Sequence, residues 1–171
     1  TNSSTVFGFA AGNSATTSNT SFLQTTAFGY KTLNANANGI ANVGVGYTAL
    51  QSNTSGGSNT AVGTAALNSN ISGSGNAALG AFALQFQQGA KNVGIGFNAG
   101  IGSTAFTSTG SIAIGYNAGF SASNGSDFNT IIGYQNGVSL TTGAGNLLLG
   151  AQPNNAASVT TGNNNIGLGF N

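Results

Sequence analysis

The sequence predicts an all-β protein, a parallel β-solenoid (β-roll) of about ten coils with 16–21 residues per coil. Three observations predict it: a short block ending in glycine recurs along the sequence, its spacing is nearly constant, and apolar residues occupy fixed columns within it. The block is clearest at residues 59–63, 92–96, 129–133 and 146–150. We expect residues 1–171 to form a single domain of this architecture.

The glycine that ends each block anchors the repeat. Successive anchors are separated by 21, 17, 17, 17, 16, 19, 18, 17 and 19 residues. This is the length of one solenoid coil, whereas helical-hairpin repeats are typically about 33 residues or longer. The anchors are Gly8, Gly29, Gly46, Gly63, Gly80, Gly96, Gly115, Gly133, Gly150 and Gly169.

A large apolar residue precedes every anchor, and we expect this column to form the core. The residue two positions earlier is Thr, Val, Ile, Leu or Ala, which suits the same face of a strand with a period of two. The large residues are Phe7, Phe28, Val45, Val62, Leu79, Ile95, Ile114, Ile132, Leu149 and Leu168.

The column between these two is mostly Gly or Ala, with Val6, Ile131 and Leu148 as larger members. Such a slim face either lets another sheet or another molecule approach closely or is simply exposed to solvent. The sequence leaves both alternatives open.

Asparagine stands four residues before the anchor in seven copies. Stacked amides can hydrogen-bond along a column of parallel strands, and Asn also initiates turns through its side chain. We therefore expect a structural ladder of amides and anchors, composed of Asn42, Asn59, Asn76, Asn92, Asn129, Asn146 and Asn165 with Gly46, Gly63, Gly80, Gly96, Gly115, Gly133 and Gly150.

An aromatic residue follows the anchor in seven copies, from Phe9 to Phe170. Strand alternation predicts that these rings point inward and pack on one another. The alternative is a strip on which a glycan stacks, with candidate residues Tyr30, Tyr47, Phe97, Tyr116 and Tyr134. A second, shorter strand is expected at 49–50, 66–67 and 83–84, return turns at 52–58 and 68–75, and longer loops at 10–24, 101–110 and 120–128.

Residues 59–67 and 111–118 resemble the head repeats of trimeric autotransporter adhesins. Similar repeats occur in bacteriophage tail fibres and large bacterial surface proteins. The resemblance spans nearly the whole sequence. It implies a parallel β-roll in which three copies pack side by side, displayed at the cell surface or in an extracellular fibre, with adhesion as the usual activity.

The small number of charged side chains excludes most catalytic mechanisms. Lys31, Lys91 and Asp127 are the only charged side chains, and the sequence has no His or Cys. No catalytic, cofactor-binding or metal-binding residues are predicted, since triads, carboxylate pairs and Ca²⁺ sites need groups that are missing. A Ser-Lys pair remains formally open, although both lysines are expected to be solvated. The glycine pattern at 44–49 resembles a dinucleotide fingerprint but lacks the acidic residue for the ribose.

Two lysines cannot neutralise a row of phosphates, so no nucleic-acid partner is expected, and no apolar run is long enough for a membrane span. Five glycosylation sequons, at Asn2, Asn19, Asn53, Asn70 and Asn124, fall mostly in expected turns and should be accessible.

We therefore predict a non-enzymatic structural or adhesive module, extracellular or at the cell surface. The protein should form a homo-oligomer, a trimer or a polymeric filament, by associating side by side or through templating ends. The alternative is a ligand-binding solenoid, such as the glycan-binding head of a phage or surface fibre. Ice binding fits less well because Val43, Ala77 and Val93 interrupt the threonine column.

Overall fold

The protein folds as a β-solenoid with one short strand in each coil. The computed structural model describes residues 3–13, 24–102, 104–151 and 160–169. Within them lie ten strands of three residues each: β1 (Thr5–Phe7), β2 (Thr26–Phe28), β3 (Val43–Val45), β4 (Thr60–Val62), β5 (Ala77–Leu79), β6 (Val93–Ile95), β7 (Ile112–Ile114), β8 (Thr130–Ile132), β9 (Leu147–Leu149) and β10 (Ile166–Leu168).

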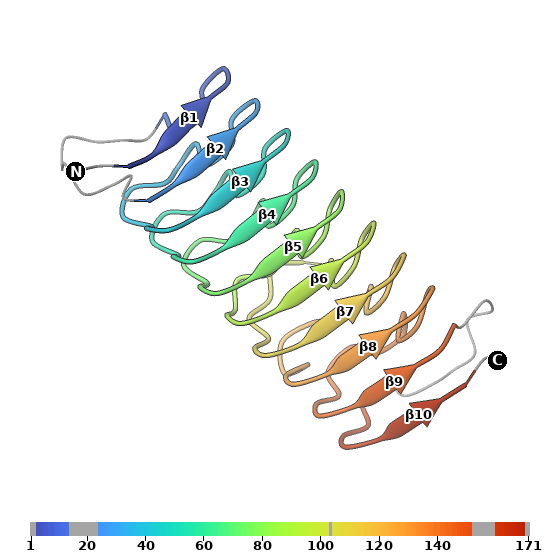
Figure 1. The fold of residues 1–171 in the computed structure, drawn as a ribbon. Coiled ribbons are helices and arrows are strands. Elements are labelled where there is room, and N and C mark those ends of the chain that lie inside the picture. Colours follow the sequence, from blue (N-terminus) through green and yellow to red (C-terminus); the bar gives the residue numbers. More distant parts are fainter. Residues whose placement is uncertain (1–2, 14–23, 103, 152–159, 170–171) are drawn as a thin grey trace.

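The ten strands form one parallel sheet in sequence order, from β1 to β10. Every pair is in register, so that Thr60 lies opposite Ala77 and Val62 opposite Leu79. Figure 1 shows the strands stacked one after another along the axis, all running in the same direction. The predicted fold class, a parallel β-solenoid, is confirmed, with about nine turns. Nine steps of about 4.8 Å make the sheet about 43 Å long.

The second strand expected in each coil is wrong, because these segments are turns. Leu50 and Leu67 have φ angles of 50° and 49°, in the left-handed region that a strand cannot use. The turns are nevertheless bonded from coil to coil. Leu50 N–H donates to Ala66 C=O and Leu67 N–H to Ala83 C=O, each at 3.0 Å. Neighbouring coils therefore share hydrogen bonds on the turn side as well as along the sheet.

The strand column expected to form the core faces outward instead. Phe28 is 53% and Leu79 52% exposed, whereas the small residues between the outer positions, such as Ala61 and Ala78, are buried. The rule that bulky apolar residues face the interior is therefore wrong for this sheet. Its small residues line the inside of the coil.

Leucines from the turns explain why the inward strand residues are small. Leu33, Leu50 and Leu67 are completely buried and pack with the inward alanines in one core cluster. A side chain at Gly44 would meet the Thr32 and Leu33 side chains. The slim face thus packs against turns of the solenoid itself, and neither expectation for it, close approach of another sheet or molecule or exposure to solvent, is correct.

The anchor glycines permit the close stacking of coils. Gly46 and Gly63 have φ angles of 135° and 138°, which residues with a side chain rarely adopt. A Cβ at Gly46 would meet the carbonyl oxygen of Gly63, and a Cβ at Gly63 would meet that of Gly80. The anchor column therefore needs glycine for both its backbone angle and its space.

Candidate interaction surface

The outer strand face is formed by the first and third residues of every strand. None of these side chains is buried; each is exposed or partly exposed. The first-position residues are Thr5, Thr26, Val43, Thr60, Ala77, Val93, Ile112, Thr130, Leu147 and Ile166, and the third-position residues are the large apolar column named above.

This face is large for an exposed apolar surface. With strands about 4.8 Å apart and residues about 3.3 Å apart along each strand, the ten three-residue strands cover on the order of 450 Å², and the exposed aromatic rings beside them enlarge the apolar surface. The largest apolar patch of a typical monomer is about 300–600 Å², and a standard interface buries about 800 Å² per partner. The outer strand face alone is therefore as large as the largest patch of a typical monomer, and the aromatic rings bring it closer to the size of an interface.

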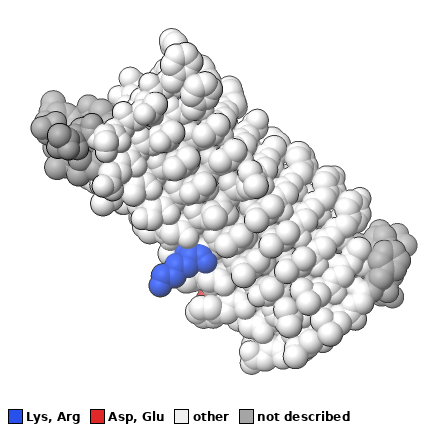
Figure 2. Space-filling model, in the orientation of Figure 1, with Lys and Arg blue, Asp and Glu red and all other residues white. Residues whose placement is uncertain are grey.

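Charge is almost absent from this surface. The face shown in Figure 2 is nearly all uncharged, with one blue side chain and a trace of red beside it. Lys31 Nζ lies 5.3 Å from the centre of the Tyr30 ring, and Lys91 is exposed. Asp127 accepts a hydrogen bond from Thr109 N–H at 2.7 Å. No helix in the described segments is long and apolar enough to cross a membrane.

The aromatic column forms two exposed ladders, so the expectation that its rings point inward is wrong. In the first, the Tyr30 ring lies between those of Phe9 and Tyr47, with centroids 5.7 and 5.1 Å away. In the second, Tyr116 lies between Phe97 and Tyr134, at 5.5 and 5.2 Å. Thr64 and Ala81 occupy the same column between the ladders, and Phe170 is outside the described residues.

Ring stacking decides which candidate residues can offer a face to a ligand. The central rings, Tyr30 and Tyr116, are 38% and 43% exposed, mainly at their edges because both faces are covered. The terminal rings, Tyr47 and Tyr134, are 56% and 51% exposed. The fifth candidate, Phe97, also carries the Phe82 ring edge-on at 5.7 Å. Of these five, only Tyr47 and Tyr134 contact a single other ring within the described residues.

Six of the seven asparagines of the expected ladder are buried inside the solenoid, opposite the return turns, and Asn165 is partly exposed. Asn59 is fully buried: its Oδ1 accepts from Asn76 N–H at 2.9 Å, and its Nδ2 donates to Gly73 C=O at 2.8 Å. The same two bonds recur in neighbouring coils. The amide oxygen accepts from the backbone N–H of the equivalent residue in the next coil, and the amide nitrogen donates to a carbonyl of the return turn. Where Ser111 replaces Asn, its hydroxyl accepts from Asn129 N–H at 3.2 Å and donates to Ser126 C=O at 2.9 Å.

A second amide ladder was not identified from the sequence. Asn53 Nδ2 donates to Asn36 Oδ1, and Asn70 Nδ2 donates to Asn53 Oδ1, each at 2.9 Å. The recurring Asn-x-x-Gly spacing at 36–39, 53–56 and 70–73 was the available signal. The accessibility expected for the sequons is therefore wrong at Asn53 and Asn70, which are fully buried, whereas Asn124 is exposed. Asn2 and Asn19 lie outside the described residues.

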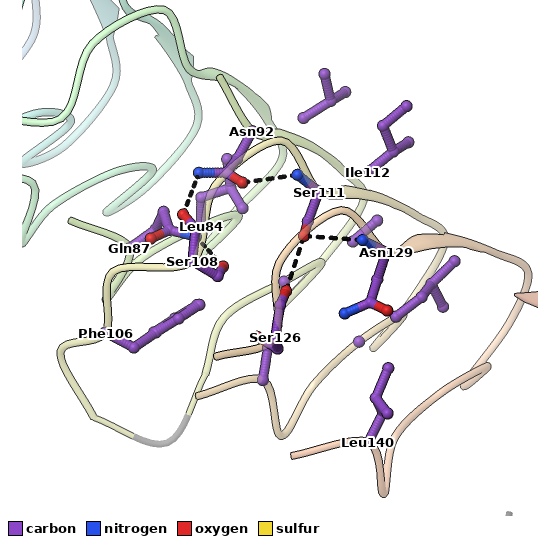
Figure 3. Close-up of a pocket in the computed structure, with 16 residues that line it drawn as sticks. Leu84, Gln87, Asn92, Phe106, Ser108, Ser111, Ile112, Ser126, Asn129 and Leu140 are labelled. Carbon is purple, nitrogen blue, oxygen red and sulfur yellow. Dashed lines mark hydrogen bonds between the residues drawn. The ribbon is translucent and has the colours of Figure 1, made fainter. Parts of the chain in front are cut away.

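A small cavity lies inside the coils of β6, β7 and β8 (Figure 3). Its volume is about 20 Å³, enough for about one water molecule. The polar groups at its wall are bonded to each other: Asn92 Nδ2 donates to Ser108 C=O at 2.9 Å, and Gln87 Nε2 to Ser108 Oγ at 2.8 Å. Pockets for small molecules usually measure about 300–1,000 Å³. The cavity is thus a packing feature and not a ligand site.

The cavity follows from the pairing of core side chains. In most coils one large residue fills the interior, supplied either by the turn or by the strand. In two adjacent coils both positions are small, and Phe106, which is 2% exposed, fills only part of the space. The filled pairs include Ala61 with Leu67 and Ile131 with Gly137; the unfilled pairs are Gly94 with Gly100 and Ala113 with Gly119.

The sequence matches no family model, and neither a curated protein nor a solved structure matches it.

Proposed function

We propose that this protein is a structural and adhesive module of an extracellular fibre, in which copies associate side by side through the outer strand face. The supporting observation is the orientation of the sheet, which in most strands places a small middle residue inside and a large apolar side chain outside. Burying apolar surface contributes about 25 cal/mol per Å². A second copy would remove this face from water without separating charged groups from solvent.

A parallel trimer is the arrangement that the resemblance to adhesin heads implies, and a filament is its alternative. The outer strand face runs the length of the sheet without a break in its apolar column, so two or more copies can align along it with their axes parallel. Display outside the cell also rests on the resemblance. Protease digestion of intact source cells tests it, because a surface-displayed protein should be degraded while cytoplasmic markers persist.

The assembly test replaces Leu79 and Ile132 by lysine. Both side chains are exposed and lie three coils apart in the same column, so the new charges should disturb the free monomer little. We expect the parent protein to sediment as an oligomer and Leu79→Lys/Ile132→Lys to sediment as a monomer with an unchanged β-sheet circular dichroism spectrum. The mass of the parent species distinguishes a trimer from a longer assembly.

Ile71→Lys is the matched control, because Ile71 is 44% exposed but lies in a return turn. This variant should still assemble. A parent protein that remains monomeric at high concentration, or a double lysine variant that assembles as the parent does, would refute association through the outer strand face.

A second candidate function, glycan binding, is favoured by the exposure of Tyr47 and Tyr134 at the ends of the two aromatic ladders. A pyranose ring presents a flat apolar face that can continue an aromatic ladder, and the surface carries few charged groups, which suits a neutral sugar. Screening neutral glycans by tyrosine fluorescence tests this function. Tyr47→Ala should abolish the response of any sugar that binds there, whereas Tyr116→Ala, which removes a covered ring, should preserve it.

A further inference from the structure

Three Asn-Gly pairs occur in the sequence, at 38–39, 124–125 and 136–137. In such a pair the backbone nitrogen of glycine can attack the asparagine amide carbon, because glycine has no side chain to hinder the approach. The reaction requires the peptide group between the two residues to reorient. The packing around each pair therefore decides whether the folded protein permits it.

Two of the pairs are held in place. Gly39 is buried, and a Cβ there would meet the Asn36 side chain and Gly56 C=O of the amide ladder. Gly137 is also buried, against the Ile131 side chain. Asn136 Nδ2 donates to Ile132 C=O at 3.0 Å, and its own C=O accepts from Gly119 N–H at 2.9 Å. Neither peptide group can reorient without disturbing the coil interior.

The peptide group of the third pair has room to reorient. Asn124 and Gly125 are both exposed in a turn, and the nearest atom to a Cβ on Gly125 would be Thr142 O at 3.8 Å. Among the described residues, the peptide group between Asn124 and Gly125 makes no hydrogen bond to another backbone group. We infer that Asn124 is a site of spontaneous deamidation, at which the folded protein converts a neutral amide into a carboxylate.

Thr107 assists the reaction at the amide oxygen. Its backbone N–H and its hydroxyl both donate to Asn124 Oδ1, at 2.9 and 3.2 Å. Donors in this position polarise the carbonyl and stabilise the negative charge that develops on oxygen during attack. Both hydrogen bonds are made to Oδ1, and neither involves Nδ2, which is the leaving group.

The step balances without an oxidant or reductant. The Gly125 nitrogen loses its proton to solvent and bonds to Asn124 Cγ, the Cγ–Nδ2 bond breaks, and ammonia departs with a proton from water. Water then opens the five-membered imide at either carbonyl, which gives aspartate or isoaspartate. The new carboxylate changes the net charge of the protein from +1 to 0, because two acidic groups then balance the two lysines.

The test follows the purified full-length protein during incubation in mildly alkaline buffer, by isoelectric focusing and mass spectrometry. We expect one acidic species, with the mass increase for NH₂ replaced by OH located at residue 124. Reaction at Asn38 and Asn136 should be at least about tenfold slower, because it requires local opening of the coil. In urea all three pairs should react at similar rates.

Asn124→Gln should prevent the acidic species and Asn38→Gln should not. The inference is overturned if the Asn124→Gln variant acquires charge as fast as the parent, or if the fragment masses place the change at residue 38 or 136. Thr107→Val keeps the backbone donor and removes the hydroxyl. It should slow the reaction, and an unchanged rate would exclude a contribution from the hydroxyl.

Discussion

At the scale of single residues, buried amides link one coil to the next. Asn59 satisfies a backbone N–H on the following coil and a backbone C=O across its own coil. An amide supplies the acceptor and the donor from one short side chain, which a carboxylate or an aliphatic residue does not. This dual role accounts for the prevalence of Asn at the ladder positions.

Replacing Asn59 by alanine should destabilise the fold by about 1–3 kcal/mol, because Asn76 N–H would lose its partner in the interior and Gly73 C=O would keep only its hydrogen bond from Asn70 Nδ2. Urea unfolding followed by circular dichroism measures the change. Asn38→Ala removes an exposed amide and should stay within about 0.5 kcal/mol of the parent. Equal losses for the two variants would contradict a structural role for the ladder.

The second ladder allows a comparison between two fully buried asparagines. Asn53 Oδ1 accepts from Asn70, whereas Asn70 Oδ1 is buried without a hydrogen-bond partner among the described residues. The next coil is one residue shorter than the preceding one and presents Gln87, whose Nε2 donates to Ser108 instead. We expect Asn53→Ala to lower the free energy of unfolding by about 1 kcal/mol more than Asn70→Ala does. The reverse order would show that the Asn70 oxygen has a partner.

At the scale of the element, most coils contribute one large core residue, from either the strand or the turn. Ala61 pairs with Leu67 from the turn, and Ile131 pairs with Gly137. The coil that contains Ala113 and Gly119 has neither and borders the cavity. Core volume is thus adjusted coil by coil.

Ala113→Val should fill part of the cavity and raise the stability by about 0.5–2 kcal/mol. Ala61→Val, in the same column, should lower it by about 1–3 kcal/mol, because Leu67 already fills that coil. Thermal and urea unfolding of both variants check the pair. Two changes of the same sign would contradict the complementary filling of coils.

The sequence specified the strands well and their orientation poorly. The glycine block located every strand, for example Thr60–Val62 before Gly63, because its spacing and alternation are regular. Alternation alone does not indicate which face of the sheet is inside. The size of the side chains suggested that the large apolar column is inside, and it faces outward. The missing information is the conformation of the turn. Leu50 enters the core from a left-handed backbone angle, which a leucine in the sequence does not indicate.

The same limit applied to the candidate surface. The aromatic column was identified from its position after the anchor, but the exposure of Tyr47 depends on how the backbone turns after Gly46. The second amide ladder was overlooked because Asn36, Asn53 and Asn70 lie in segments that resemble ordinary polar turns. Their burial depends on the return path of the coil, which no local pattern specifies.

At the scale of the molecule, a rod with few charges and an apolar face should respond to salt in a characteristic way. Sulfate is excluded from protein surfaces and strengthens apolar burial, and the protein has almost no charges for salt to screen. We expect sedimentation velocity to show tighter association in sodium sulfate and no dissociation in sodium chloride. Leu79→Lys/Ile132→Lys should lose this response. Dissociation of the parent by sodium chloride would indicate an interface held by charges.

The anchor glycines limit how such a rod can grow. Each carbonyl in that column lies where the preceding glycine would carry a side chain, so a partial insertion that shifts one anchor out of line would break the contact on both sides. A segment running from one anchor to the next fits without this penalty. Gene duplication can therefore lengthen the rod in increments of about 4.8 Å. Recombination then changes the length of the rod by whole coils.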